Sequence, residues 1–562
     1  MKFFDELSHF SPNRLFVSMV LGVIAGISYA MLIPIVTNSL QQPHNLSYQE
    51  EGSKAQFWGV QVDNENMALL FFLAIVCILI CQTVSQVMLA LISSDVTRNL
   101  RIEIYKKVLR AKMSSTEQVG SSRLMASLTS DVQTIVGGAK AVPDIIVSLF
   151  TLLGMLIFLL YLQVEVFVFV IQCIFLGVIL YQVPMFFGNK AFFKSRKHVD
   201  NLHDGIRSLS SGIKELKLNK NKKDNFVETE LLENEDLIIE NQKLGLTIIT
   251  AALNFGNMIA LFVLGIVAFV FVNYHQIDQQ TLIAVFMVLL YVTGPIGSIL
   301  NGLPSLMMAN ISYQKMQTLL VELEDEGYHD KVSEVPAWST FSLTGVLYNY
   351  DSGDNDRQFS VGPVDLTFKK GEVTYIVGGN GSGKSTLSKL ITLHYQPAGG
   401  QVLFDSVPVD VGNANSYRQM ISAIYSDFHL FETVLDSYAQ GEELQLLVND
   451  YLVKLDLADK VTFSNGRFST LKLSDGQRKR LALLNAYLED KDMYLFDEWA
   501  ADQDPEFREI FYTQLLTDLK SRGKLVIVIT HDDQYFDQAD RLIRMDKGKV
   551  VSESTYKLEN VG

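Results

Sequence analysis

Long apolar segments dominate the first 309 residues of the chain. Six of them contain no Asp, Glu, Lys or Arg, and each has at least the roughly 20 residues that a helix needs to cross the hydrocarbon core of a bilayer. They cover residues 15–37, 67–93, 145–164, 166–188, 244–273 and 281–309. The pattern predicts six membrane-spanning helices, with the third and fourth joined in a tight hairpin. No A-x-A cleavage pattern follows the first segment, so we expect it to be retained as a span.

Basic residues set the expected orientation of these helices. Segments 94–141 and 189–243 contain eight and eleven Lys or Arg residues, whereas the segments expected on the other side contain only Lys54. Because Lys and Arg concentrate in cytoplasmic loops, we expect a multi-pass protein with both termini in the cytoplasm. Apolar residues three and four apart predict helices within the basic segments. We expect their turns near 114–119 and 205–213 to press on a cytoplasmic domain.

Uncharged polar residues interrupt several spans. They are Gln86, Gln172, Gln182, Asn254, Asn257 and Asn301. Two interpretations remain open: hydrogen bonds between helices, worth about 0.6 kcal/mol each on average, or the lining of a polar substrate path. Pro295 and Pro304 are expected to bend the last span.

The hydrophobic pattern changes after residue 312. A helical run leaves the membrane, a short polar segment follows, and β-branched runs then alternate with helical patterns, which is typical of an α/β domain. We therefore expect a transmembrane domain over residues 1–312, a linker over 313–337 and an α/β domain over 338–562.

Composition agrees with a chain that is partly embedded in a membrane. Of its 562 residues, 19% are charged, and the mean hydropathy is +0.18. A net charge of −15 offers no basic surface for nucleic acid, so that class of partner is excluded. Cys77, Cys81 and Cys173 all fall inside apolar segments, which favours a packing role over a disulfide or zinc framework.

A glycine-rich loop, GGNGSGKST at residues 378–386, fits the pattern G-x-x-x-x-G-K-[ST]. Glycines let the backbone wrap around phosphate oxygens with the amides pointing inward. Lys384 is expected to reach the outer phosphates, and the Ser385 hydroxyl is expected to ligate Mg²⁺. The predicted phosphate-binding residues are Gly378, Gly379, Asn380, Gly381, Ser382, Gly383, Lys384, Ser385 and Thr386.

Two adjacent acids, Asp497 and Glu498, end a second apolar run. Carboxylates at the end of a buried strand lose hydration unless a ligand binds there. We expect Asp497 to hold Mg²⁺ through water and Glu498 to orient and deprotonate an attacking water. A third strand, KLVIVIT, is followed by His531. Ligands of open α/β sheets bind at the carboxyl ends of strands, so Glu498, His531 and Lys384 form the predicted catalytic set.

A third motif lies at the start of a predicted apolar helix, where Ser474 and Gly476 are close to the N-terminus. The free amides of a helix N-terminus, together with a serine, can bind an anion. A simple capping role for Ser474 is the alternative.

Together these motifs resemble those of the ATP-binding-cassette (ABC) transporters over essentially the whole chain, with six spans followed by one nucleotide-binding domain. The resemblance implies ATP and Mg²⁺ as cofactors. It identifies LSDGQ as the signature sequence, which closes over ATP held by a second subunit, so that one cassette per chain implies a homodimer. It assigns further ATP-contacting roles to Tyr350, which would stack on adenine, and to Ser474, Gly476, Gln477 and Asp504.

Within this family, the run FDEWAADQDP most resembles exporters of cyclic peptides and peptide siderophores, of the pyoverdine, syringomycin and lasso-peptide type, in the bacterial inner membrane. Asp475 replaces the usual glycine of the signature, and Ala501 replaces a serine ahead of the loop aspartate. Ser426, with Asp427 beside it, stands where the family normally has a glutamine that senses Mg²⁺ and couples it to the membrane domain. Both Ser426 and Asp427 carry oxygen atoms that could ligate Mg²⁺ in its place. Trp499 is a candidate contact to the neighbouring subunit.

The expected function is ATP-driven export of a cyclic peptide, a peptide siderophore or a precursor from cytoplasm to periplasm. A lipid or multidrug exporter of the same architecture is one alternative. A membrane-anchored ATPase that regulates a biosynthetic complex is another. A periplasmic partner at the polar segment 38–66 is left open.

Overall fold

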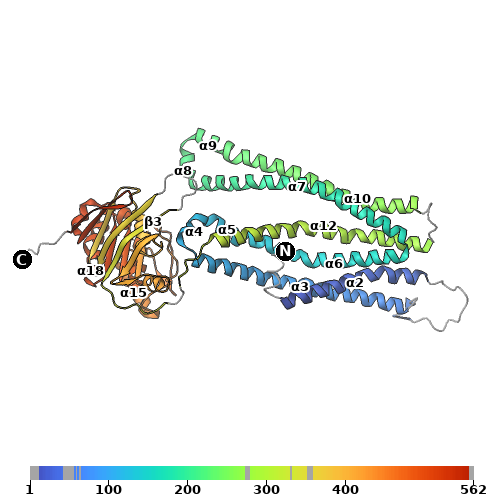
Figure 1. Cartoon of the computed structure of the whole chain (residues 1–562), viewed down its shortest axis with the longest axis horizontal. Helices are drawn as coiled ribbons and strands as arrows, with labels where there is room; N and C mark the ends of the chain where they lie inside the picture. Colours follow the sequence, from blue (N-terminus) through green and yellow to red (C-terminus); the bar gives the residue numbers. More distant parts are fainter. Residues whose placement is uncertain are drawn as a thin grey trace, which may run out of the picture. The chain divides into compact units, whose positions relative to one another are not determined.

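The computed structural model describes residues 12–41, 56–57, 60–61, 65–271, 279–328, 332–350 and 359–555. The chain divides into two compact units. The N-terminal unit contains residues 1–104 and 122–319, and the C-terminal unit contains residues 105–121 and 320–562. Figure 1 shows long helices in the first and a sheet-containing α/β structure in the second. Residues 105–121 therefore belong with the α/β structure, although membrane helices flank them in sequence.

Six helices among the described residues are long and apolar enough to cross a membrane. They are α2 (Pro12–Gln41), α3 (Glu65–Arg110), α6 (Val132–Leu162), α7 (Val164–Ser211), α10 (Glu233–Ile266) and α12 (Gln279–Glu322). Shorter helical segments connect or extend them: α5 (Ser121–Ala126), η1 (Ser127–Asp131), α8 (Ile213–Leu218), α9 (Lys220–Phe226), η2 (Val227–Leu232) and η3 (Val267–Phe271). Each predicted span overlaps one long helix. Only Gln163, with an extended backbone (φ −159°, ψ 106°), separates α6 from α7, which produces the predicted hairpin.

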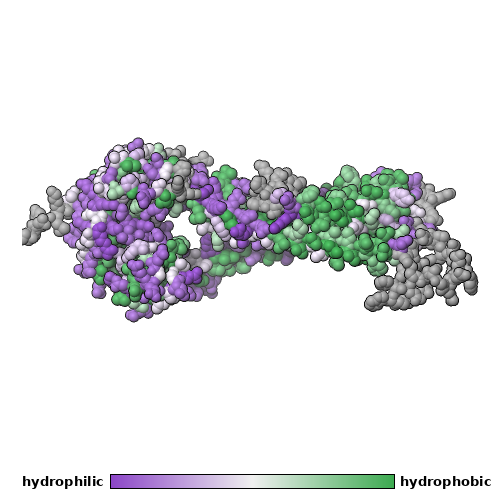
Figure 2. All heavy atoms as spheres, turned by 90° about the horizontal axis from the view of Figure 1, so that it is seen from below, coloured by the Kyte–Doolittle hydropathy of each residue, from purple (hydrophilic) through white to green (hydrophobic). Residues whose placement is uncertain are grey.

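Small residues let the long helices pack closely. Helix α10 runs along α7, and α2 packs on α6 (Figure 1). A Cβ added at Gly154 would lie 2.3 Å from the Cβ of Ala30, and one at Gly26 would lie 2.7 Å from the Val147 carbonyl oxygen. Such contacts are typical of helix association in lipid. Figure 2 shows a largely hydrophobic outer surface over much of this bundle, as a lipid environment requires.

The predicted extramembrane segment 38–66 is described only in part. Within it, β1 (Gln56–Phe57) pairs in antiparallel fashion with β2 (Val60–Gln61). Most of the other residues of this segment lie outside the described residues, so a partner-binding role there stays a prediction.

The C-terminal unit contains a six-stranded sheet in the order β14-β13-β5-β12-β11-β8 and a four-stranded sheet in the order β4-β3-β6-β7. The strands are β3 (Thr340–Asn349), β4 (Ser360–Lys369), β5 (Val373–Gly378), β6 (Gly399–Phe404), β7 (Val407–Pro408), β8 (Ile421–Ile424), β11 (Met493–Asp497), β12 (Leu525–Ile529), β13 (Arg541–Asp546) and β14 (Lys549–Thr555), with β9 (Phe463–Ser464) and β10 (Arg467–Phe468) as a separate hairpin. The helices are α4 (Met113–Val119), α13 (Lys384–Ile391), α14 (Ala414–Arg418), α15 (Gly441–Lys454), α16 (Asp475–Glu489), η4 (Trp499–Asp502), α17 (Pro505–Ile510), η5 (Phe511–Leu515), α18 (Leu516–Ser521) and η6 (Asp533–Gln538).

Burial on both faces explains why the central strands are continuous apolar runs. Tyr494 and Phe496 of β11 pack in one hydrophobic cluster with residues of α16. Met493 and Leu495, which point to the opposite face, pack in a second cluster with residues of α13. Strands β5, β12, β11 and β8 run parallel to one another. Their carboxyl ends therefore meet at one edge of a rigid sheet.

Candidate functional site

Four neighbouring strands deliver polar residues to this edge. The glycine-rich loop follows β5, His531 follows β12 and the acid pair ends β11, as the sequence predicts. Strand β8 adds a fourth group, because Ser426 and Asp427 follow it with only Tyr425 between. Ser426, which stands where the family usually has a glutamine, thus follows a strand that ends at the same edge as the predicted catalytic residues.

The phosphate loop has a backbone that requires glycine. Gly381 and Gly383 have φ values of +75° and +98°, a region that residues with a Cβ rarely adopt. A Cβ at Gly378 would lie 2.4 Å from the Met545 carbonyl oxygen. The Nζ atom of Lys384 donates to the Gly378 and Gly379 carbonyl oxygens at 2.8 and 3.1 Å, so the lysine curls back over the loop.

The loop fits a bound phosphate in a second respect. The Ser382 hydroxyl is buried and has no hydrogen-bond partner in the described part of the chain. A buried hydroxyl without a partner is costly, and a phosphate oxygen would supply one. Burial lowers the pKa of Lys384, while the charges of Glu498 and Asp497 oppose that shift. An added phosphate would favour the charged ammonium further.

The acid pair combines one buried and one accessible carboxylate. Asp497 is 5% exposed. Burial raises its pKa to about 6. The negative charges of Glu498 and Asp427 raise this pKa further, and the positive charge of Lys384 opposes the shift. A divalent cation at this carboxylate would offset the burial. Among the described residues, no group of three His, Cys, Asp or Glu side chains could hold a metal. The Asp497 carboxylate and the Ser385 hydroxyl, which are predicted to hold Mg²⁺, are both oxygen donors, and Mg²⁺ is usually held by one or two protein groups together with waters and phosphate oxygens.

Glu498 points toward His531. Its Oε1 atom lies 3.2 Å from the His531 Nε2 atom, and both side chains are nearly half exposed. The Glu498 amide donates to the Ile529 carbonyl oxygen at 2.9 Å, and its φ of +50° is left-handed. This backbone turns the carboxylate away from the buried strand and toward solvent, where a water molecule can reach it.

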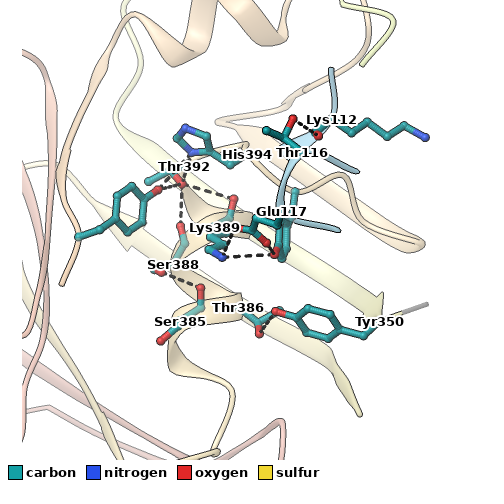
Figure 3. A network of polar contacts seen from close by, with 12 residues as sticks. Lys112, Thr116, Glu117, Tyr350, Ser385, Thr386, Ser388, Lys389, Thr392 and His394 are labelled. Carbon is teal, nitrogen blue, oxygen red and sulfur yellow. Dashed lines mark hydrogen bonds and ion pairs between the residues drawn. The ribbon is translucent and has the colours of Figure 1, made fainter. Parts of the chain in front are cut away.

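Tyr350 lies beside the first turn of α13, which continues from the phosphate loop. Its hydroxyl is 3.0 Å from the Thr386 hydroxyl, as Figure 3 shows. Tyr348 and Tyr395 each contact its ring edge to face. An aromatic side chain is thus held next to the predicted phosphate site, and its stacking on adenine stays a prediction.

Ser474 and Gln477 cap helix α16. The Gln477 amide donates to the Ser474 hydroxyl at 3.4 Å, and the Ser474 amide donates to the Gln477 side-chain oxygen at 3.2 Å. Within the described part of the chain, none of the contacts of these two residues or of Gly476 reaches the phosphate loop. The structure therefore shows the capping role that the sequence left open. A role toward a nucleotide on a second subunit stays a prediction.

The contacts of Asp504 are with residues of its own unit. It caps helix α17 by accepting from the Phe507 amide at 2.9 Å, and it pairs with Arg480. The hydrogen bond from Phe507, helped by the charge of Arg480, holds the pKa of Asp504 below its usual range. Its ATP-contacting role also stays a prediction.

Trp499 corrects one expectation. Its side chain is 1% exposed, its ring stacks on Phe511 with centroids 4.3 Å apart, and its Nε1 atom donates to the Lys479 carbonyl oxygen at 2.9 Å. The space between α16 and η5 accommodates it completely. Packing of Trp499 against a neighbouring subunit is therefore wrong.

Helix α4 carries a residue that sequence reasoning missed. Glu117 forms an ion pair with Lys389 of α13 at 2.7 Å and accepts a hydrogen bond from the Tyr395 hydroxyl, also at 2.7 Å. Figure 3 shows Glu117 and Lys389 side by side. The expected contact of the turn near 114–119 with the α/β domain is thus present. Glu117 is the sole acid of α4, and this is the feature of the sequence that could have identified it as a contact residue. The second turn, near 205–213, belongs to the N-terminal unit, and its expected contact stays a prediction.

The N-terminal unit contains a cavity of about 340 Å³ between α7, α10 and α12. Asn254 and Asn301 line it, together with Tyr181 and mainly apolar side chains. Gln86 instead donates to Asp144 at 2.8 Å. Gln86 thus makes a hydrogen bond between helices, whereas a polar substrate path at Asn254 and Asn301 stays a prediction.

Comparison with known proteins gives matches over both units. A family model described as "ABC transporter transmembrane region" matches residues 15–296, and one described as "ABC transporter" matches residues 361–501. ATP-binding protein SyrD of Pseudomonas syringae pv. syringae is 32% identical over 558 residues, which cover 98% of this chain and 95% of that protein. The multidrug resistance ABC transporter ATP-binding and permease protein of Lactococcus lactis subsp. lactis is 23% identical, covering 97% and 91%.

Among solved structures, a bacterial Atm1-family ABC exporter with ATP bound matches with a TM-score of 0.71. The match covers 97% of this chain and 96% of that chain at 16% sequence identity. At this identity the likeness concerns the fold alone.

Proposed function

Because this chain belongs to the ABC transporter family, as an ATP-driven exporter half-transporter, we propose that it exports a cyclic peptide, a peptide siderophore or a precursor of one. The observation that carries this choice is the relationship with SyrD, which extends over nearly the whole of both chains. The resemblance of the FDEWAADQDP run to peptide exporters supports it. Among the residues that the structure describes, none of those lining the cavity beside Asn254 and Asn301 is charged, which suits an uncharged amphipathic part of such a cargo.

Two copies of the chain form the working unit in this proposal. The signature residues Ser474, Gly476 and Gln477 of one copy would meet the ATP held by the other, and Tyr350 would stack on its adenine. Multiple basic residues in segments 94–141 and 189–243 support cytoplasmic termini in a bacterial inner membrane.

The residues at the sheet edge divide the chemistry of ATP hydrolysis between them. Glu498 orients the attacking water and accepts its proton, and His531, whose Nε2 atom lies 3.2 Å from the Glu498 Oε1 atom, would contact the transferring phosphoryl group. Lys384 neutralises charge on the outer phosphates. Mg²⁺, held by Ser385 and through water by Asp497, with Ser426 and Asp427 as further oxygen donors, would supply additional positive charge. Such transfers depend mainly on positioning and electrostatics.

The contact of Glu117 with Lys389 supports a route between nucleotide site and membrane helices. Helix α4 follows α3, a predicted membrane span, with two residues between them. Helix α13 begins at Lys384. A rearrangement of the phosphate loop would therefore reach the end of a membrane helix through one ion pair.

A multidrug exporter is the second candidate, favoured by the full-length relative from Lactococcus lactis. Transport by the full chain in sealed proteoliposomes distinguishes the two. The expected result is ATP-dependent accumulation of a cyclic peptide, but not of hydrophobic drugs, with Glu498→Gln as the inactive control. Accumulation of drugs alone would identify the second candidate. ATP hydrolysis without accumulation of any compound would favour a third function, that of a membrane-anchored ATPase that supports a biosynthetic complex.

A further inference from the structure

Lys479 of helix α16 is a buried cation that contacts the backbone of the acid pair at Glu498. Its side chain is 6% exposed. The Nζ atom donates to the Glu498 carbonyl oxygen at 2.7 Å and forms an ion pair with Asp502 at 2.6 Å. One ammonium group thus contacts the first and last residues of the turn that runs from Glu498 to Asp502.

That turn begins with an unusual backbone conformation. Glu498 has a φ of +50°, which a residue with a Cβ adopts only where the surrounding structure holds it. Its amide is fixed by the Ile529 carbonyl oxygen. On the other side of the residue, its carbonyl oxygen is fixed by Lys479. The direction of the carboxylate toward His531 therefore depends on both anchors.

Further contacts join the same helix to the same turn. The Trp499 Nε1 atom donates to the Lys479 carbonyl oxygen at 2.9 Å, and the Gln503 side-chain amide donates to the Gly476 carbonyl oxygen at 3.0 Å. A Cβ at Gly476 would lie 2.6 Å from the Asp502 carbonyl oxygen. The start of α16 and residues 498–503 are consequently joined by several contacts.

We propose that Lys479 is a positioning residue for ATP hydrolysis. It holds the Glu498 backbone so that the carboxylate faces the attacking water, and it ties that acid to the helix whose first residues carry the signature. The inference rests on the proposed function, because it acts through the role of Glu498. The proposed function can nevertheless hold while the inference fails, since an ABC exporter without this role for Lys479 would still hydrolyse ATP through Glu498.

The test uses the full chain in proteoliposomes and the variant Lys479→Met, which keeps the length of the side chain but removes its donors. The expected result is a kcat for ATP lowered by about 10- to 100-fold, as for a misplaced catalytic group, with an unchanged KM. Binding of a fluorescent ATP analogue should also be unchanged. Lys479→Gln, which can still donate to the carbonyl oxygen, should recover part of the kcat. Should Lys479→Met fail to fold, Lys479→Gln and Asp502→Ala give smaller losses of kcat that test the same anchor.

A double-mutant cycle separates positioning from simple destabilisation. In a Glu498→Gln background, loss of Lys479 should reduce the residual kcat by less than twofold, because the group that it positions is absent. An equal loss in both backgrounds, or a Lys479→Met enzyme with the kcat of the parent, would overturn the proposal. If Glu498→Gln itself hydrolyses ATP like the parent, the proposed catalytic role of Glu498 fails, and the inference about Lys479 fails with it.

Discussion

Glu117 and Lys389 are 272 residues apart in sequence, yet their side chains form an ion pair of 2.7 Å. The hydroxyl of Tyr395 donates to the second carboxylate oxygen of Glu117, so the acid is held from two directions. The residues just before α4 are held to the segment that follows α12 by backbone hydrogen bonds, from the Lys112 amide to Glu324 and from the Glu326 amide to Arg110. The polar contact of Glu117 is therefore made between two elements that are already fixed.

Glu117→Gln should weaken transport more than ATP hydrolysis. The substitution keeps the size of the side chain but removes the charge that pairs with Lys389, a contact worth about 1 kcal/mol when partly exposed. We expect cargo transport to fall about fivefold while the basal ATPase rate changes by less than twofold. Transport and hydrolysis measured in the same proteoliposomes check this ratio. The matched control is Asp518→Asn, which breaks a pair of 2.8 Å between Asp518 of α18 and Arg522, the residue that follows this helix. Equal losses of transport in both variants would remove Glu117 from the transmission route.

Glu498→Gln should bind ATP but nearly stop its turnover. The amide keeps the shape of the side chain but cannot accept the proton of the attacking water, and general-base catalysis contributes about 10²- to 10⁴-fold. ATP binding and steady-state hydrolysis give the two readouts. Glu506→Gln, at an exposed acid in the first turn of α17, is the control and should leave the rate unchanged. A Glu498→Gln enzyme that hydrolyses ATP at the parental rate contradicts the assigned role.

Lys384→Ala should lose both ATP affinity and transport. Hydrogen bonds to charged groups contribute about 1.5–3 kcal/mol, so the affinity for ATP should fall roughly 10- to 100-fold. Nucleotide binding to the purified chain measures the first loss, and export from intact cells measures the second. Lys454→Ala removes an exposed lysine of α15 and should change neither. Unchanged export by cells with the Lys384→Ala variant would show that transport does not depend on ATP bound at this site.

Local pattern predicted the six long helices, the phosphate loop and the acid pair. Each of these depends on neighbours in sequence: an apolar run long enough for a bilayer, glycines at fixed spacing, or two acids after a buried strand. The anchors of these groups join distant segments. Neither the contact of Lys479 with the Glu498 carbonyl oxygen nor the pair of Glu117 with Lys389 leaves a periodic signal. For Trp499, the deciding factor was the space between α16 and η5, which only the packed structure defines.

His394 gives the C-terminal unit a titratable group that is uncharged near neutral pH. Its Nδ1 atom lies 2.8 Å from the Thr392 hydroxyl and 3.1 Å from the Tyr425 hydroxyl. Burial lowers the pKa of His394, and the positive charges of Arg418 and Lys389 lower it further, while Glu326 and Glu117 oppose them. The folded unit therefore binds a proton at His394 less readily than the unfolded chain does.

The stability of the C-terminal unit should consequently fall as the pH drops below 6.5, the usual pKa of histidine. Above that pH neither state is protonated at His394, and the full contribution is present. Below it the unfolded chain takes up a proton first, which lowers the free energy of unfolding by up to about 1.4 kcal/mol per pH unit until the folded pKa is reached. Thermal unfolding of the purified chain between pH 7.5 and 5.5 measures this slope. His394→Asn, which can keep a hydrogen bond to Thr392, should flatten it, whereas His429→Asn, at an exposed histidine, should not. A slope that is the same in all three proteins would assign the pH dependence to other groups.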